Sequence, residues 1–203
     1  RQRQMCIRDR SIKTAEQIRK YSAGAQRNNA VYNFQDIIAV SSGMKLVKSE
    51  ARTAAASPAN VLITGESGTG KELFAQAIHN ASPRFAGPFV PISCGGFSRE
   101  TVDSILIGTE KNPGKFIQAD GGTLFLDGIS EMSQDMQSFL LRFLEDGIVT
   151  PIGSRRSVQT DVRVISAAGR EVLQKVKDGS FRLDLYYRLN VLRIDLPPLR
   201  ERQ

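Results

Sequence analysis

A run of eight residues has the composition needed to hold a phosphate chain. It consists of Gly65, Glu66, Ser67, Gly68, Thr69, Gly70, Lys71 and Glu72, and its first seven residues fit the pattern G-x-x-x-x-G-K. Glycines let the backbone curl so that successive N–H groups point at phosphate oxygens, and the lysine reaches the outer phosphates. The run therefore predicts a nucleotide site; the alternative is a glycine-rich turn with a surface lysine.

The residues on either side of this run have the patterns of a strand and a helix. The apolar stretch Val61–Thr64 precedes it, and Lys71–Asn80 follows it with Phe74, Ala77 and Ile78 at helical spacing. A helix that starts at the loop would add the partial positive charge of its N-terminus to the phosphate site. This strand–loop–helix context favours nucleotide binding over a chance match.

Asp127 is a second candidate, because it ends the apolar run Thr123–Asp127. A carboxylate at the end of a strand can hold Mg²⁺, or the water shell of the ion, against bound phosphates. Glu72 stands where a serine or threonine usually contacts this metal, so the ion would depend more on Asp127 and on water. The alternative role for Asp127 is to cap the turn that follows.

Apolar strands alternate with helices along the remaining chain. Further strands are predicted at Phe89–Ser93, Val162–Ala167 and Val191–Leu196, and the clearest helix at Gln134–Asp146, with Ser133 as its N-cap. Such an alternation predicts an α/β fold, with a five-stranded parallel sheet covered on both faces.

The N-terminal part has a different character. The first ten residues read as a translated sequencing adapter, the alternative being a natural basic arm, and we expect them to lie outside the fold. They carry four arginines and one aspartate, so without them the formal net charge falls from +7 to +4. Residues 11–33 are polar and predict a linker. The spacing of Val40, Met44, Val47 and Ala51 predicts a helix within Tyr32–Ala56, ended by Ser57-Pro58.

The overall composition is that of an ordinary globular domain, with 40% hydrophobic and 24% charged residues. No apolar run approaches a membrane span, so we expect no membrane contact and a cytoplasmic location. The cysteines, Cys6 and Cys94, are too few for a disulfide framework or a metal set. The modest basic charge and the lack of a recognition-helix pattern do not indicate nucleic-acid binding by this segment.

Several motifs besides the phosphate loop follow one another in a specific order. They are AIH at Ala77–His79, PFVPISC at Pro88–Cys94, ADGGTLFLD at Ala119–Asp127, FLLRFLEDG at Phe139–Gly147 and FRLDLYYRLNVLRIDLPPLRER at Phe181–Arg202. Together with GESGTGKE they resemble the AAA+ domain of bacterial sigma-54-dependent transcription activators. The resemblance covers about residues 34 to 203, which we take as the domain.

The resemblance implies a three-layer α/β/α P-loop NTPase, with its strands in the order 5-1-4-3-2 and a helical lid beyond residue 203, so that the chain would be a fragment. Such domains couple ATP turnover in a ring to remodelling of sigma-54 RNA polymerase, and Glu72 is usual in them. Arg182 and Arg188 match arginines that reach a neighbouring subunit's nucleotide, where a guanidinium stabilises charge on the γ-phosphate. Taken alone, these arginines are surface residues that could pair with Asp184 or Glu171.

Four departures from the family pattern gather around the catalytic apparatus. The glutamate that activates the attacking water is replaced by Gly128, the sensor asparagine by Gly169, and the asparagine that holds that glutamate at rest by Ser93. The loop with GAFTGA that touches sigma-54 is reduced to Thr109–Pro113. Loss of a positioned base typically lowers a rate by ~10² to 10⁴.

We therefore expect a degenerate member that binds ATP with Mg²⁺, hydrolyses it weakly or not at all, and does not remodel sigma-54. It would be a nucleotide-stabilised, self-associating part (ring or dimer) of a regulator that acts on another RNA polymerase holoenzyme. DNA would be contacted only through a C-terminal domain outside this sequence. Two alternatives stay open: an active ATPase activator, with another carboxylate such as Glu131 replacing the missing one, and a scaffold that binds no nucleotide.

The other candidate residues have simpler interpretations. His79, the only histidine, is expected to pack at a helix edge rather than to act in catalysis, and Cys94 is expected to pack. Glu131, four residues after Asp127, is expected to be solvated.

Overall fold

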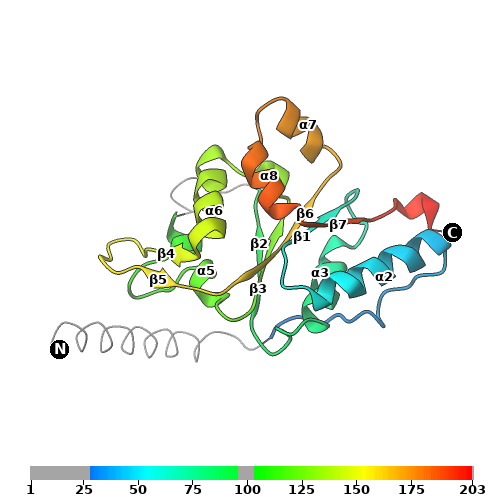
Figure 1. The fold of residues 1–203 in the computed structure, drawn as a ribbon, viewed down its shortest axis with the longest axis horizontal. Coiled ribbons are helices and arrows are strands. Elements are labelled where there is room, and N and C mark those ends of the chain that lie inside the picture. Colours follow the sequence, from blue (N-terminus) through cyan, green and yellow to red (C-terminus); the bar gives the residue numbers. More distant parts are fainter. Residues whose placement is uncertain (1–27, 96–102, 203) are drawn as a thin grey trace.

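The computed structural model describes residues 28–95 and 103–202, and its centre is a parallel sheet of five strands (Figure 1). The strands are β1 Val61–Thr64, β2 Phe89–Ser93, β3 Thr123–Asp127, β6 Arg163–Ala168 and β7 Leu192–Asp195. Their order across the sheet is β2-β3-β6-β1-β7, and every neighbouring pair is parallel. Numbered along the chain, this is the expected order 5-1-4-3-2, so the predicted α/β fold is confirmed.

Helices cover both faces of the sheet. On one face lie α2 Ser42–Ala56 and α3 Lys71–Asn80, and on the other α5 Lys115–Gln118, α6 Gln134–Asp146, α7 Val172–Lys177 and α8 Leu183–Leu189. The shorter elements are a π-helical turn Asp103–Ile107, 3₁₀ turns Ile129–Glu131 and Leu199–Glu201, and a hairpin of β4 Ile148–Val149 with β5 Val158–Gln159.

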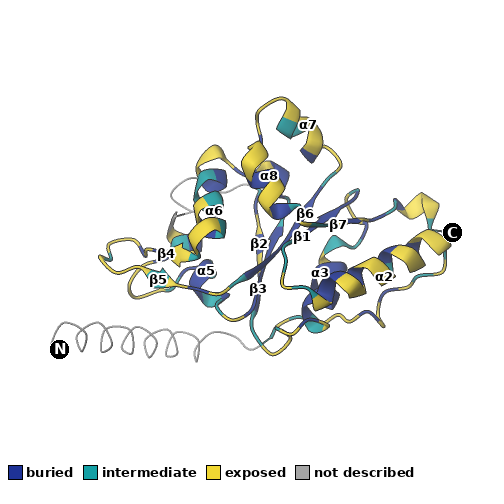
Figure 2. Ribbon diagram, in the orientation of Figure 1, coloured by how far each residue is buried: buried dark blue, intermediate teal, exposed yellow. Residues whose placement is uncertain are grey.

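The sheet divides the core into two apolar clusters. Along β3, Leu124 and Leu126 belong to the cluster under α6, while Phe125 between them belongs to the cluster under α2 and α3. This alternation follows from the period of two in a strand, and because both faces are covered, all three side chains are buried. Figure 2 shows the result: the three inner strands β1, β3 and β6 are buried almost throughout, and exposed residues lie on the edge strands and on the outer faces of the helices.

Helix α6 begins and ends as its sequence predicts. The Oγ of Ser133 accepts a hydrogen bond from the backbone N–H of Met136, so it is the N-cap. Gly147 ends the helix in the left-handed conformation that glycine adopts readily. Met136, Leu140 and Phe143 are buried on one stripe, which fixes α6 on the sheet.

The start of α2 was predicted too early. The helix begins at Ser42, and Val40, taken as part of its apolar stripe, is 69% exposed. Buried Arg163 on β6 ties the end of α2 to the sheet. Its guanidinium donates hydrogen bonds to the carbonyls of Ala54 and Ala55, and to that of Ala59 just beyond the helix. Burial, with a smaller effect of Arg84, lowers the pKa of Arg163 to about 10.

The end of the predicted linker lies along α3. Asn28 donates to the side chain of Asn80, and the backbone N–H of Val31 donates to Gln76. Residues 28–33 are therefore bonded to the helix that follows the phosphate loop, while residues 1–27, with the predicted adapter segment, lie outside the described residues.

Candidate nucleotide-binding site

The candidate residues meet at one edge of the sheet, where four parallel strands end. The register pairs Ser93 of β2 with Asp127 of β3, and Asp127 with Ala167 of β6, while Thr64, the last residue of β1, pairs with Ala168. The loops that leave these strands therefore open at the same level, which is where α/β sheets bind ligands.

The phosphate loop turns tightly between β1 and α3. Gly68 and Gly70 both have positive φ, and a Cβ added to either would meet no atom within 4 Å, so the space beside these two glycines is open. Gly65 is different: a Cβ there would lie 2.8 Å from Oγ1 of Thr69, which itself donates to the carbonyl of Glu66. Thr69 therefore packs closely against Gly65 at the start of the loop, while Gly68 and Gly70 lie beside open space.

Lys71 and Glu72 begin α3, directly behind this loop. The Nζ of Lys71 donates to the carbonyls of Gly65 and Glu66, both at 2.9 Å, so the ammonium lies over the loop. The carboxylate of Glu72 accepts from Gln76 one turn along the helix. The lysine is therefore placed with the glycine amides, as a phosphate site requires.

A cavity of about 530 Å³ lies between the phosphate loop and the ends of β2, β3 and β6. Its lining includes Lys71, Ser93 and Asp127, together with Gly128 and Gly169. The volume falls within the ~300–1,000 Å³ of small-molecule pockets. The full lining is Ser67, Gly68, Gly70, Lys71, Glu72, Leu73, Ser93, Asp127, Gly128, Ser130, Glu131, Ala168, Gly169 and Glu171.

These residues fit a nucleoside triphosphate with a magnesium ion. The open loop amides and Lys71 would hold the phosphates, and Asp127, half-buried at the end of β3, would hold the ion directly or through water. The ion would supply charge neutralisation between the outer phosphates.

Two further carboxylates line the cavity: Glu131, which the sequence offered only as an alternative replacement for the missing glutamate, and Glu171, which the sequence did not assign to the site. Glu131 is exposed, as expected, but it lines the cavity instead of pointing into bulk solvent. Glu171 covers Gly169 and accepts a hydrogen bond from Oγ of Ser130. Its pKa is lowered: burial alone would raise it, but hydrogen bonds from the backbone and Ser130, with Lys175 and Lys71 nearby, outweigh that effect. Proximity in sequence to Asp127 and Gly169 was the signal that could have indicated both.

The arginine candidates lie away from this cavity within the protomer. Arg182 precedes α8 and pairs with Asp184 at 2.8 Å, and Arg188 on α8 pairs with Glu145 of α6 at 2.8 Å. The first pair is one of the alternatives left open by the sequence. Both arginines are partly exposed, so the fold leaves them accessible to a second copy of the chain.

The C-terminal turn is bonded to the phosphate loop, which the sequence did not indicate. Arg200 donates two hydrogen bonds to the carboxylate of Glu66, and Arg202 donates to the carbonyl of Thr69. The pKa of Glu66 is lowered, chiefly by the hydrogen bond from Arg200. The loop is therefore connected to residues 200–202 as well as to α3.

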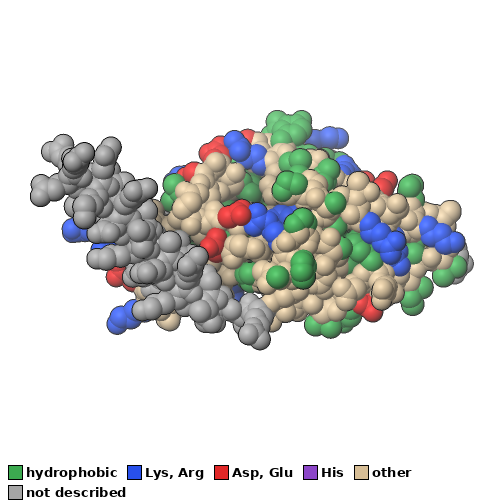
Figure 3. Space-filling view, turned by 60° about the horizontal axis from the view of Figure 1, so that its bottom comes forward, with side chains coloured by type: hydrophobic (Ala, Val, Ile, Leu, Met, Phe, Trp, Pro, Cys, Tyr) green, Lys and Arg blue, Asp and Glu red, His purple; other side chains and the backbone are tan. Residues whose placement is uncertain are grey.

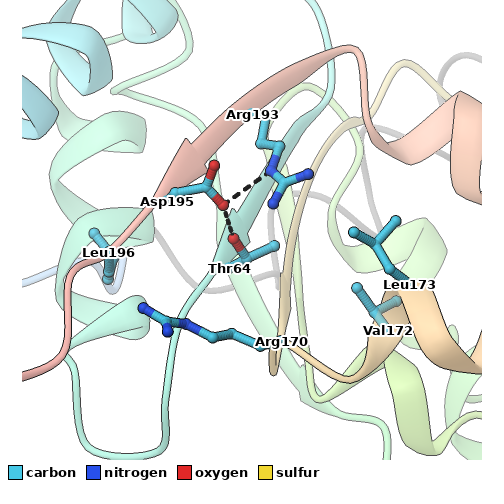
Figure 4. A pocket seen from close by; sticks show the side chains of 7 residues that line it. All are labelled: Thr64, Arg170, Val172, Leu173, Arg193, Asp195 and Leu196. Carbon is cyan, nitrogen blue, oxygen red and sulfur yellow. Dashed lines mark hydrogen bonds and ion pairs between the residues drawn. The ribbon is translucent and has the colours of Figure 1, made fainter.

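A second cavity of about 320 Å³ lies beside the loop, at the ends of β1 and β7 (Figure 4). In it, Asp195 accepts hydrogen bonds from Thr64 and from Nε of Arg193, while Arg170 reaches in from the segment after β6. Thr64 immediately precedes Gly65, so these contacts fix the end of β1 from which the phosphate loop starts.

The segment Thr109–Pro113, where the sequence analysis expects a reduced loop, closes into a tight turn. The N–H of Thr109 donates to the carbonyl of Asn112, and Gly108 and Pro113 form an antiparallel bridge. A Cβ on Gly108 would lie 2.1 Å from the nitrogen of Gly114, so the two glycines let the ends of the turn touch. Thr109 also pairs with Ile152 in a parallel bridge, which ties the turn to the segment after β4.

His79 and Cys94 are both buried, His79 at the end of α3 remote from the phosphate loop and Cys94 directly after β2. His79 lies within the core and not at a helix edge as expected: its Nδ1 is 2.8 Å from Oγ1 of Thr123, and burial lowers its pKa to about 4. Cys94 packs in the core as expected. Burial, with smaller effects of Asp127 and Glu131, raises the pKa of its thiol, so it is not a reactive nucleophile.

Comparison with known proteins agrees with this geometry. The family described as the Sigma-54 interaction domain matches residues 37–195. A signal-transduction and transcriptional-control protein of Clostridium beijerinckii is 49% identical over 85% of this chain and 29% of its own length. The HTH-type transcriptional regulatory protein TyrR of Salmonella typhimurium is 49% identical over 83% of this chain and 33% of its own. This chain thus spans about a third of these relatives.

A solved structure shares the fold over nearly the whole chain. NtrX from Brucella abortus, in complex with ATP, matches with a TM-score of 0.79 and 32% identity, covering 99% of this chain and 46% of that one. A structure of NtrX with ADP matches equally well. No helix in the described residues is long and apolar enough to cross a membrane.

Proposed function

Because the chain belongs to the Sigma-54 interaction domain family, with the α/β fold of a P-loop NTPase, we propose that it is the ATP-binding module of a bacterial transcription regulator. The observation that carries the proposal is the cavity in which the open phosphate loop, Lys71 and Asp127 face the same space. The structure of NtrX, a structural relative, is a complex with ATP.

Magnesium belongs to the same proposal. Among the carboxylates that line the cavity, we assign the ion to Asp127 at the end of β3, because Glu72 supplies no hydroxyl. The ion would therefore keep most of its water, as Mg²⁺ usually does. We propose that hydrolysis is weak or absent, because Gly128 and Gly169 supply no side chain to orient water or sense the γ-phosphate.

The proposed partners follow from the surface. Arg182 and Arg188 are accessible, and we assign them to the nucleotide of a second copy of the chain in a ring or dimer. The tight turn at Thr109–Pro113 offers no projecting loop for sigma-54, so the regulator would act on RNA polymerase through another surface. On the face drawn in Figure 3, basic, acidic and apolar side chains are interspersed over the coloured area, which suits a module that leaves DNA binding to another domain.

A titration of the purified protein with ATP and Mg²⁺ tests the central claim. We expect saturable binding and a rise in melting temperature; ATP at 100 times its Kd stabilises the fold by about 2.7 kcal/mol. Lys71→Ala should abolish both effects, while Lys177→Ala, a lysine of α7 outside the cavity, should leave them unchanged. Absence of saturable binding by the unaltered protein would favour the scaffold.

Promoter opening measures whether the regulator acts on sigma-54. With the full-length regulator we expect no ATP-dependent opening of a promoter by sigma-54 RNA polymerase. Opening that disappears with Lys71→Ala would make the protein an active sigma-54 activator instead.

A further inference from the structure

The structure places an acidic side chain, that of Glu131, next to Gly128, where the family pattern has a glutamate. We propose that the carboxylate of Glu131 replaces the missing side chain at position 128 and positions the water that attacks the γ-phosphate of ATP. This inference rests on the proposed ATP binding and assigns weak hydrolysis to one residue.

The local fold brings Glu131 back over Gly128. Gly128 has a φ of +70°, and the 3₁₀ turn Ile129–Glu131 follows it, closed by a hydrogen bond from the N–H of Glu131 to the carbonyl of Gly128 at 2.9 Å. As a result, a Cβ added to Gly128 would lie 3.8 Å from Cδ and from Oε1 of Glu131. The carboxylate is therefore in contact with the space that a side chain at position 128 would enter.

A second glycine makes room for the same carboxylate. A Cβ on Gly95, just after β2, would lie 2.1 Å from Oε2 of Glu131, so a side chain there would displace the carboxylate from this position. Within residues 28–95 and 103–202, no hydrogen bond or ion pair engages the carboxylate. It lines the cavity with Lys71 and Asp127, and it is free to accept a hydrogen bond from water.

Glu171 is the other acidic residue whose carboxylate lies against a glycine of the cavity, but its hydrogen bonds suit a structural role. A Cβ on Gly169 would lie 1.9 Å from Oε2 of Glu171, so this carboxylate covers Gly169 closely. Its Oε1, however, accepts from Oγ of Ser130, and Lys175 donates to the carbonyl of Ser130. Glu171 is thus bonded to the wall of the cavity, which leaves Glu131 as the carboxylate available to water.

The step itself is ordinary hydrolysis. The water oxygen forms a bond to the γ-phosphorus, and the bond from that phosphorus to the bridging oxygen breaks, with its electron pair leaving on ADP. The water proton passes to the carboxylate of Glu131 and then to solvent. A positioned base of this kind contributes ~10² to 10⁴ in rate.

The first test compares phosphate release by single variants of the purified protein with saturating ATP and Mg²⁺. Glu131→Gln should lower kcat at least tenfold with the Kd for ATP unchanged, since it keeps the size of the side chain and removes the base. Glu50→Gln, an exposed glutamate of α2, is the matched control and should keep the original rate. A Glu131→Gln protein that hydrolyses ATP at the original rate, or a loss confined to Glu171→Gln, would overturn the assignment.

The second test moves the carboxylate back to position 128. In the Glu131→Gln background, Gly128→Glu should restore hydrolysis, while Gly128→Ala, which imposes the same backbone strain without a carboxylate, should not. If Gly128→Glu prevents folding, the single variant Glu131→Gln decides alone. Saturable ATP binding with no hydrolysis by the unaltered protein would remove this inference and leave the proposed function standing; no ATP binding would remove both.

Discussion

His79 makes the stability of this domain depend on pH in a window where few other groups titrate. Its ring is buried between α3, which begins with Lys71, and β3, which ends with Asp127, and its Nδ1 is hydrogen-bonded to Thr123. Burial lowers its pKa to about 4; the backbone of Gly87 opposes this shift, and the charge of Arg163 adds to it. Protonation would place a cation in the core between the two elements that carry the nucleotide site.

The direction and the magnitude of the change in folding stability follow from the difference between the pKa of His79 in the folded and in the unfolded chain. The pKa of an exposed histidine is about 6.5, so as the pH falls the unfolded chain binds a proton before the folded one does. The folded state keeps its full stability above pH 6.5 and loses it progressively down to about pH 4. At pH 5 the loss is about 2 kcal/mol, and the complete loss is about 3 kcal/mol, at 1.36 kcal/mol for each pKa unit.

Denaturant unfolding at pH 7 and at pH 5 measures this loss. The free energy of unfolding should fall by about 2 kcal/mol in the original protein, and by much less in His79→Gln, since His79 is the only histidine. Carboxylates with lowered pKa, such as Glu171 and Asp184, begin to contribute only at lower pH. Equal losses in the two proteins would refute the argument.

Three further predictions concern the loop, the core and the arginines. Gly65→Ala puts a methyl group 2.8 Å from Oγ1 of Thr69, so we expect the fold to lose about 1–3 kcal/mol of stability and to bind ATP more weakly. Thermal unfolding with and without ATP measures both effects, and an unchanged melting temperature would contradict the loop geometry. Leu140→Ala empties a fully buried position on α6 and should lower the unfolding free energy by about 2–5 kcal/mol, and a loss below 1 kcal/mol would mean that α6 repacks. Arg182→Ala and Arg188→Ala should each leave ATP binding intact and slow hydrolysis by about 10³ or more; unchanged phosphate release would assign them to their surface ion pairs.

The main strands were predictable because glycines and prolines separate short apolar runs. The bounds predicted for β1, β2 and β3 agree with the structure, and β6 and β7 differ by one residue at each end. The hairpin of β4 and β5 was missed because each strand has two residues, too few to show a period. The early start of α2 was wrong because Val40 has helical spacing but is exposed, a fact that only tertiary packing decides.

The site was predictable where chemistry is local in sequence and not where it depends on backbone shape. The structure brings Lys71, Asp127, Gly128 and Gly169 around one cavity, as the motifs indicated, while their roles remain predictions. The position of Glu131 depends on the left-handed conformation of Gly128, which no pattern of residue types specifies.

Because of the guanidinium of Arg163, we expect the two ends of α2 to differ in their stability against local unfolding. It fixes the last turn to the middle of the sheet, whereas Ser41 at the other end makes no side-chain capping bond. Amide hydrogen exchange should therefore show α2 fraying from Ser42 while its last turn opens only with the whole domain.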